Sequence, residues 1–146
     1  MSEANSLLVE QIFRDANFLR TLGIQLTAFG FGWCEAQVPI TPAFYQQHGF
    51  VHAGVLMTLA DHTCGGAAAS TLPVDKDVIT VENKISFLRP AIGELLKCRC
   101  DVLRAGKNLI FVEATVTVLR KNEPFTVAKA SSTLLVIPRA HTPATA

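Results

Sequence analysis

Charge is scarce in this sequence and long apolar runs are missing, which excludes several classes of protein. Lysine and arginine number 13 against 12 aspartate and glutamate residues, so the formal net charge is +1. Such a chain has no basic stripe to neutralise a phosphate backbone, which argues against nucleic acid as a partner. No apolar stretch approaches the roughly 20 residues that a membrane span needs. The first residues, MSEANSLLVEQIF, carry an acidic side chain where a secretory signal has positive charge, so we expect a cytoplasmic protein.

The four cysteines show no pattern for metal or disulfide chemistry. Cys34, Cys64, Cys98 and Cys100 form no CxxC pair and have no ligand spacing with the histidines, and no HExxH motif is present. Cys98 and Cys100 stand two apart in a strand-like stretch, so they share a face and are expected to be small buried residues. We therefore expect neither a metal site nor a cofactor.

Apolar residues, by contrast, are abundant. They make up 49% of the 146 residues, and only 17% are charged. The length suits a single domain, 1–146, with one core. Because an apolar fraction this high leaves a surplus in a small domain, we expect a subunit interface to cover it, and hence a homo-oligomer.

The first quarter of the chain predicts a helix and then a hairpin. Ser6 is a plausible helix N-cap and Gly23 a stop signal, which together indicate an amphipathic helix near residues 6–20. Residues 24–40 contain two strand-like pieces separated at Gly30 and Gly32, a pattern typical of a hairpin. A loop punctuated by proline and glycine follows.

Residues 53–70 are apolar or small on nearly every side, which predicts a helix buried on most faces. Four strand candidates then follow in what reads as a meander: 77–88, 94–103, 109–121 and 125–137. One turn between them is built on Gly106 and another is closed by Pro124, and a loose tail is expected over 138–146. The order predicts an α+β domain, an antiparallel sheet wrapped around one long central helix.

Chemistry is concentrated where the loop meets that helix. Ala53 and Gly54 are small residues at the helix start, where backbone amides lack acceptors and could hold a developing oxyanion. Asp61 is a carboxylate on an otherwise apolar helix. It either caps loop amides or faces solvent, or it acts as a general base or nucleophile. Seven residues separate Gly54 from Asp61, roughly 10 Å along the axis. Two groups that act on one carbonyl would therefore come from two chains.

The segment QQHGFVHAGVLMTLADHTCGGAA, 46–68, resembles the signature of the phenylacetate-pathway (PaaI-like) branch of hotdog-fold thioesterases. Gln46 stands at the amide position, His52 begins the His-Gly-Gly element, and Asp61 occupies the acid position. The resemblance continues through VITVENKISFLRPAIG, which places Thr80 at an active-site hydroxyl, and through VLRAGKNLIFVEA. It runs from Leu22 to Ile137. Two residues depart from the pattern, Gln for Asn at 46 and Ala for Gly at 53.

The resemblance implies a hotdog fold and a dimeric or tetrameric acyl-CoA thioesterase that works without metal, CoA being part of the substrate. The Ala53 amide would polarise the thioester carbonyl, His52 would hold the loop, and Gln46 would orient water or carbonyl. Asp61 and Thr80 of the neighbouring chain would activate and position the attacking water.

CoA contacts are expected at the turn between the second and third of the four strands. That turn supplies the candidates Arg104, Gly106, Lys107 and Asn108, and Arg89 is a further cation, although ordinary surface charge explains Arg89 almost as well. Aromatic and sulfur side chains at Phe44, Tyr45, Phe50 and Met57 would shape a pocket for aryl or medium-chain acyl groups.

The alternative is a non-catalytic acyl-CoA binding or sensing module, while a hotdog dehydratase would need a different His and acid pattern.

Overall fold

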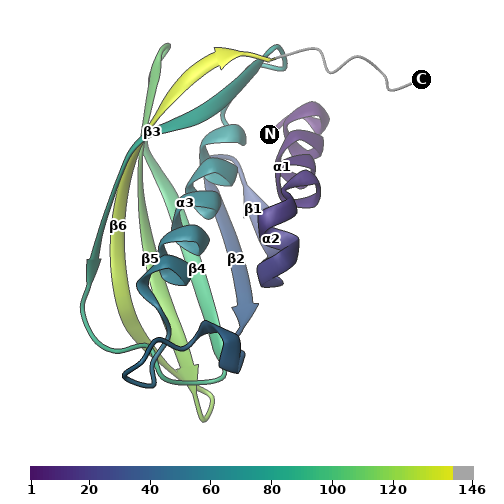
Figure 1. The fold of residues 1–146 in the computed structure, drawn as a ribbon. Coiled ribbons are helices and arrows are strands. Elements are labelled where there is room, and N and C mark those ends of the chain that lie inside the picture. Colours follow the sequence, from purple (N-terminus) through teal and green to yellow (C-terminus); the bar gives the residue numbers. More distant parts are fainter. Residues whose placement is uncertain (140–146) are drawn as a thin grey trace.

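The computed structural model describes residues 1–139, in which one antiparallel sheet curls around a long helix (Figure 1). The six strands follow the sheet order β1-β2-β4-β5-β6-β3. Their bounds are β1 Gln25–Gly30, β2 Trp33–Pro39, β3 Lys76–Phe87, β4 Leu95–Ala105, β5 Leu109–Arg120 and β6 Glu123–Pro138. The α+β hotdog architecture predicted from the sequence is confirmed. The tail predicted over 138–146 lies mostly outside the described residues.

Helix α3, Ala53–Ala69, occupies the concave side of the sheet, as its composition predicted. Most of its second half is buried, and the helix packs against β2, β4 and β5, where small residues let the backbones approach closely. Gly66 shows how tight this packing is, because a Cβ there would lie 2.8 Å from the Cys34 sulfur. Within residues 1–139, no helix combines the length and apolarity that crossing a bilayer requires.

The N-terminal helical segment differs from its prediction. It consists of two helices, α1 Glu3–Asp15 and α2 Asn17–Leu22, in place of one helix over 6–20. Ser2, not Ser6, is the N-cap of α1, and Ala16 adopts an extended conformation between the helices. Asp15 and Asn17, both weak helix formers, flank this break. Gly23 ends α2 at φ +76°, as predicted.

The predicted meander holds only for β4, β5 and β6. Strand β3 pairs with β6 and not with β4, so it forms an edge of the sheet. Alternation reveals where a strand lies but not which strand becomes its partner, and here the connection 88–94 crosses the end of the sheet. The β5–β6 turn is also tighter than predicted. Lys121 and Asn122 form it with positive φ, and Pro124 stands inside β6.

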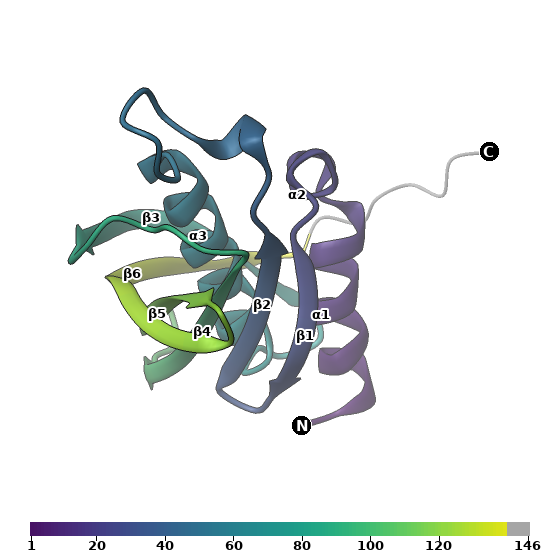
Figure 2. The same cartoon turned by 90° about the horizontal axis from the view of Figure 1, so that it is seen from below.

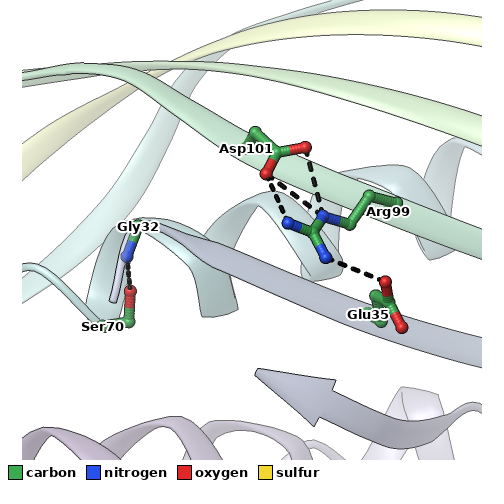
Figure 3. Close-up of polar contacts among 5 residues, drawn as sticks. All are labelled: Gly32, Glu35, Ser70, Arg99 and Asp101. Carbon is green, nitrogen blue, oxygen red and sulfur yellow. Dashed lines mark hydrogen bonds and ion pairs between the residues drawn. The ribbon is translucent and has the colours of Figure 1, made fainter. Parts of the chain in front are cut away.

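Around Arg99, the convex face of the sheet is polar and internally paired. Arg99 donates to Glu35 at 2.9 Å and to Asp101 at 2.7 Å (Figure 3). Its guanidinium also lies over the Trp33 ring. The hydrogen bonds to Asp101 and Glu35 raise the pKa of Arg99 above its ordinary value. At the end of α3, the Ser70 hydroxyl donates to the Ala67 carbonyl and accepts from the Gly32 amide at 2.8 Å, which ties the β1–β2 turn to the helix.

Candidate active site on the open strip of α3

At the start of α3, the first backbone amide has no hydrogen-bond partner within residues 1–139, whereas the second donates to a side chain of the same chain. His52 is the N-cap, and its Nδ1 accepts a hydrogen bond from the Gly54 amide at 2.9 Å. Since Nδ1 accepts, the neutral ring carries its proton on Nε2. Ala53 is exposed, and its amide has no hydrogen-bond partner among residues 1–139. This amide lies at the positive end of the helix dipole, where a carbonyl oxygen could accept from it.

The requirement for glycine at position 54 follows from the same contact. A Cβ on Gly54 would lie 3.1 Å from His52 Nδ1, tight enough to disturb the cap. The His52 backbone amide donates to the Phe44 carbonyl at 2.8 Å, which anchors the loop that precedes the helix. His52 therefore fixes both the loop and the first turn of α3, the position predicted for it.

Gln46 shapes that loop from within. Its Oε1 accepts from the His48 amide at 2.6 Å, and its backbone carbonyl accepts from the Gly49 amide at 2.9 Å. Gly49 closes the turn with φ +81°. Gln46 does not line the grooves at the α3 terminus in a single chain. Its Nε2 donor remains available for a ligand, and its side-chain oxygen already accepts one hydrogen bond.

Asp61 and Thr80 lie in one groove, as the sequence predicted. Asp61 is half-buried on α3, and Thr80 is exposed on β3. The groove has a volume of about 680 Å³. Within residues 1–139, no Lys, Arg or His nitrogen lies within 4.0 Å of the Asp61 carboxylate. A half-buried carboxylate without a cation is costly unless it has hydrogen bonds or a function.

The residue that contacts this carboxylate was not predicted from the sequence. Asn83 Nδ2, from β3, donates to Asp61 Oδ1 at 3.1 Å. An asparagine in the interior of a strand was the available signal, because that residue is disfavoured there.

A second, smaller groove adjoins the first. It has a volume of about 280 Å³ and is lined by His52, Tyr45 and their neighbours. The two grooves share Phe18, Gly54 and Thr58. Along α3, the residues at 54, 58 and 61 follow helical spacing, so they form one open strip of the helix between α2 and β3. This strip, Gly54–Thr58–Asp61, carries the candidate site.

Aromatic and sulfur-containing side chains line three different grooves around the strip. Met57 lines the Asp61 groove and Tyr45 the His52 groove, whereas Phe50 lines a third groove beside Ala53. Phe18 of α2 was not singled out from the sequence, yet it lines both main grooves and is 60% exposed. Its position over the strip makes it a further candidate for acyl contact.

The residues predicted to bind CoA do not gather at this site within one chain. Gly106 and Lys107 lie by the C-terminal end of α3 in a groove that Lys76 also lines. Arg89 lies near the N-terminal end, beside Phe50 and Ala53. Strand register separates the two places by about nine residues, roughly 30 Å. Arg104 and Asn108 are exposed beside the Gly106 turn. One CoA molecule cannot bridge these groups with its phosphates in a single chain.

His62 and the four cysteines contribute to packing. None of them belongs to the open strip Gly54–Thr58–Asp61. His62 Nε2 lies 3.2 Å from the Ile12 carbonyl, and its ring meets the edge of Phe13. Burial lowers the pKa of His62, which outweighs the opposing effects of the Ile12 carbonyl and the Asp61 charge. All four cysteines are buried, as predicted for Cys98 and Cys100. Burial raises the pKa of the Cys34 thiol to about 12, so it stays protonated at neutral pH.

Comparisons with known proteins agree with this geometry. The crystal structure of a thioesterase family protein from Silicibacter pomeroyi is 34% identical, covers 92% of this chain and 99% of its own, and superposes with a TM-score of 0.90. The 1,4-dihydroxy-2-naphthoyl-CoA hydrolase of Listeria monocytogenes is 26% identical over 66% of this chain and 79% of its own length. The PaaI protein from the phenylacetic acid degradation operon of E. coli shares the fold, with a TM-score of 0.82, 20% identity and coverage of 93% and 95%.

The family match covers the part of the chain that holds the candidate site. Residues 48–124 match the thioesterase superfamily, a segment that starts before His52 and extends past the β4–β5 turn. It therefore includes the open strip, Thr80 and Asn83. The matched segment exceeds half of the 146 residues. The chain belongs to the thioesterase superfamily.

Proposed function

We propose that this chain hydrolyses acyl-CoA thioesters to a free acid and CoA, in an active site that two copies of the chain complete together. One observation carries the proposal. The free Ala53 amide stands at the N-terminus of α3, one residue before the open strip, and Asp61, a carboxylate without a cation within residues 1–139, lies at the far end of that strip. The first is what a thioester oxyanion needs, and the second is what an attacking water needs.

The chemistry follows from these two groups. The thioester carbonyl oxygen accepts from the Ala53 amide, and the positive end of the α3 dipole favours the charge that develops on it. Asp61 takes a proton from a water that attacks the carbonyl carbon, or attacks that carbon itself. Thr80 lies in the same groove and would position the water, while the free Nε2 of Gln46 would orient it or the carbonyl. Collapse of the tetrahedral intermediate breaks the C–S bond, and the departing CoA thiolate takes up the proton that Asp61 accepted from the water. If Asp61 itself attacks, collapse leaves an acyl-Asp61 anhydride, which a water then hydrolyses to the free acid while its proton goes to the thiolate.

The need for two copies rests on distance and on the β3 edge. Eight residues, roughly 12 Å of helix, separate Ala53 from Asp61, too far for one carbonyl to meet both. Strand β3 is a 12-residue edge strand with exposed Ile79 and Val81, and long apolar edges favour pairing with another chain. Figure 2 shows that α1 lies beside β1 at the other edge, so β3 is the open one. Two-fold pairing at β3 would place the Asp61 of one copy near the Ala53 of the other.

The same two-fold arrangement gives a reason for the separation of the cationic groups. Antiparallel pairing would bring the Arg89 end of one copy toward the Lys107 end of the other. A CoA nucleotide could then meet Lys107, Lys76 and Arg104 of one chain while its acyl group enters the other. The name of the Listeria relative specifies an aromatic acyl-CoA. That name and the aromatic lining support aryl or medium-chain acyl groups as substrates.

Thiol release from a panel of acyl-CoAs tests this proposal. Phenylacetyl-, benzoyl- and hexanoyl-CoA are offered to the wild type and to Asp61→Asn, and free CoA is measured. We expect turnover by the wild type and a loss of two or more orders of magnitude, on the order of 10²–10⁴, in the variant. A wild type that binds the CoA esters without hydrolysing any of them would instead establish a binding or sensing module.

The proposed nucleotide contacts have their own test. Arg104→Ala combined with Lys107→Ala should raise KM for the preferred acyl-CoA more than it lowers kcat, because phosphate contacts are remote from the reacting carbonyl. Arg120→Ala, at the opposite end of the sheet, serves as the control for lost positive charge. An unchanged KM in the double variant would remove these residues from the CoA site.

A further inference from the structure

Asn83 is a polar residue at a position of β3 where an apolar side chain would be expected. It lies on the inner face of β3, which also presents Val78 and Ile85 toward the helix side of the sheet. Its Nδ2 donates to Asp61 Oδ1, but its Oδ1 is buried without a hydrogen-bond partner among residues 1–139. Leaving such an acceptor unpaired typically costs about 1–3 kcal/mol, so stability alone does not explain an asparagine here.

The residue opposite Asn83 has the same property. Ser132 of β6 is its register partner, and the Ser132 hydroxyl is also buried without a hydrogen-bond partner in the described part of the chain. A donor and an acceptor, both unpaired, thus face the same side of neighbouring strands. A change of the Ser132 side-chain rotamer that brings its Oγ within hydrogen-bond distance of Asn83 Oδ1 would hold the amide in the orientation that presents Nδ2 to Asp61. Local conflicts with good packing are expected where function requires them.

The bond to Asn83 also determines how the carboxylate is presented. Within residues 1–139, Asn83 is the one side chain that donates to Asp61, and no cation contacts it. With Oδ1 held by the amide, Oδ2 is the oxygen left for the groove that Asp61 lines together with Thr80. A fixed plane matters for a base, because misplacement by about 1 Å can cost on the order of 100-fold in rate.

We propose that Asn83 is a positioning residue that fixes the Asp61 carboxylate, and that Ser132 supports the amide from behind. The proposal rests on the proposed function, since it assigns a purpose to Asp61 as base or nucleophile. Asn83 acts on the reaction through its hydrogen bond to Asp61. The competing explanation is a structural tie between β3 and α3, which would contribute to stability alone.

Three variants at position 83 separate the two roles. Kinetics of thiol release and thermal unfolding are measured for Asn83→Ala, Asn83→Asp and Asn83→Leu beside Asp61→Asn. Loss of a hydrogen bond to a charged group should lower kcat by roughly 10- to 100-fold, with KM within about threefold. Asn83→Asp keeps the shape but removes the donor and adds like charge, so it should lose more than Asn83→Ala. Asn83→Leu should lose activity while its Tm stays level or rises, because an unpaired polar atom is gone.

The outcomes distinguish this inference from the proposed function. Positioning is overturned if Asn83→Leu and Asn83→Asp both retain kcat within twofold while Asp61→Asn is inactive, or if activity falls only in step with Tm. If Asp61→Asn is fully active, Asp61 is not the base or nucleophile. The proposed function is then wrong, and so is the inference that rests on it. Should Asn83→Leu not fold, the nearly isosteric Asn83→Asp decides alone. Ser132→Ala, with the exposed neighbour Ser131→Ala as control, should show a smaller loss of kcat in the same direction.

Discussion

The two halves of α3 lie against the same sheet but differ in whether their polar groups have hydrogen-bond partners. In the second half, the Thr63 hydroxyl donates to the Leu59 carbonyl at 2.6 Å, and Ser70 bonds both Ala67 and Gly32. In the first half, the Ala53 amide has no partner within residues 1–139, and Asp61 has one amide and no cation. One half therefore secures the fold, and the other keeps a donor and an acceptor available for substrate.

This division resembles a general trade-off between stability and activity. Groups that are fully paired in the folded chain add to its stability, whereas groups held ready for a transition state go unpaired until substrate binds. Variants in the first half should therefore change rate more than stability. Variants in the second half should do the reverse.

Among the variants that test this difference between the two halves of α3, Ala53→Pro should have the largest effect. Proline is well tolerated at the first position of a helix, and His52 already has the extended conformation that a following proline requires, φ −61° and ψ 138°. The substitution removes only the free N–H, so kcat should fall by roughly 100- to 1000-fold while Tm changes little. Steady-state kinetics and thermal unfolding check both parts. Ala53→Ser, which keeps the amide, is the control. Wild-type turnover by Ala53→Pro would contradict the oxyanion assignment.

A pair of glycines in the second half should show the opposite pattern. A Cβ at Gly66 would lie 2.8 Å from Cys34 Sγ and 2.9 Å from a Phe13 ring carbon, whereas a Cβ at Gly65 meets nothing within 4 Å. Gly66→Ala should therefore lower the unfolding free energy by about 1–3 kcal/mol through overpacking. Gly65→Ala should raise it by up to about 1 kcal/mol through its helix propensity. Denaturant titration measures both, and equal effects at the two positions would contradict the packing described for this half.

The smallest effect concerns pH and the boundary between the halves, where His62 joins α3 to α1. Its pKa is lowered in the folded chain because the ring is buried, so below its ordinary value of 6.5 the unfolded chain binds more protons than the folded one. Stability should consequently decline as pH falls below that value. In His62→Gln, unfolding measured at pH 5 and 7.5 should show a smaller decline. An identical pH dependence in the variant would mean that His62 does not cause it.

Local patterns predicted most of the fold and part of the site. The all-round apolar composition of 53–69 located α3, and alternation located β4 and its buried cysteines. The pairing of β3 with β6 could not be predicted, because it depends on contacts between residues about 50 positions apart. The Ala16 break was missed because a single extended residue hardly disturbs an amphipathic pattern.

The sequence related those site candidates that are neighbours along the chain, and it did not relate those that come together only through folding. Ala53 and Asp61 lie on one helix, so helical spacing was enough to relate them. Asn83 reaches Asp61 only because β3 passes beside α3, and Phe18 covers the strip only because α2 folds back over it. The resemblance supplied Thr80, which spacing alone would not have connected to Asp61. No local rule relates such positions.

The most direct test of the account compares one residue from each half of α3. Thiol release and Tm are measured for Asp61→Asn and for Ser70→Ala, which removes the tie to Gly32. We expect Asp61→Asn to lose at least about 100-fold in kcat while its Tm holds, and Ser70→Ala to lose about 1–3 kcal/mol of stability while kcat holds. If Asp61→Asn hydrolyses acyl-CoA as fast as the wild type, the carboxylate is not the base or nucleophile and the proposed mechanism is wrong.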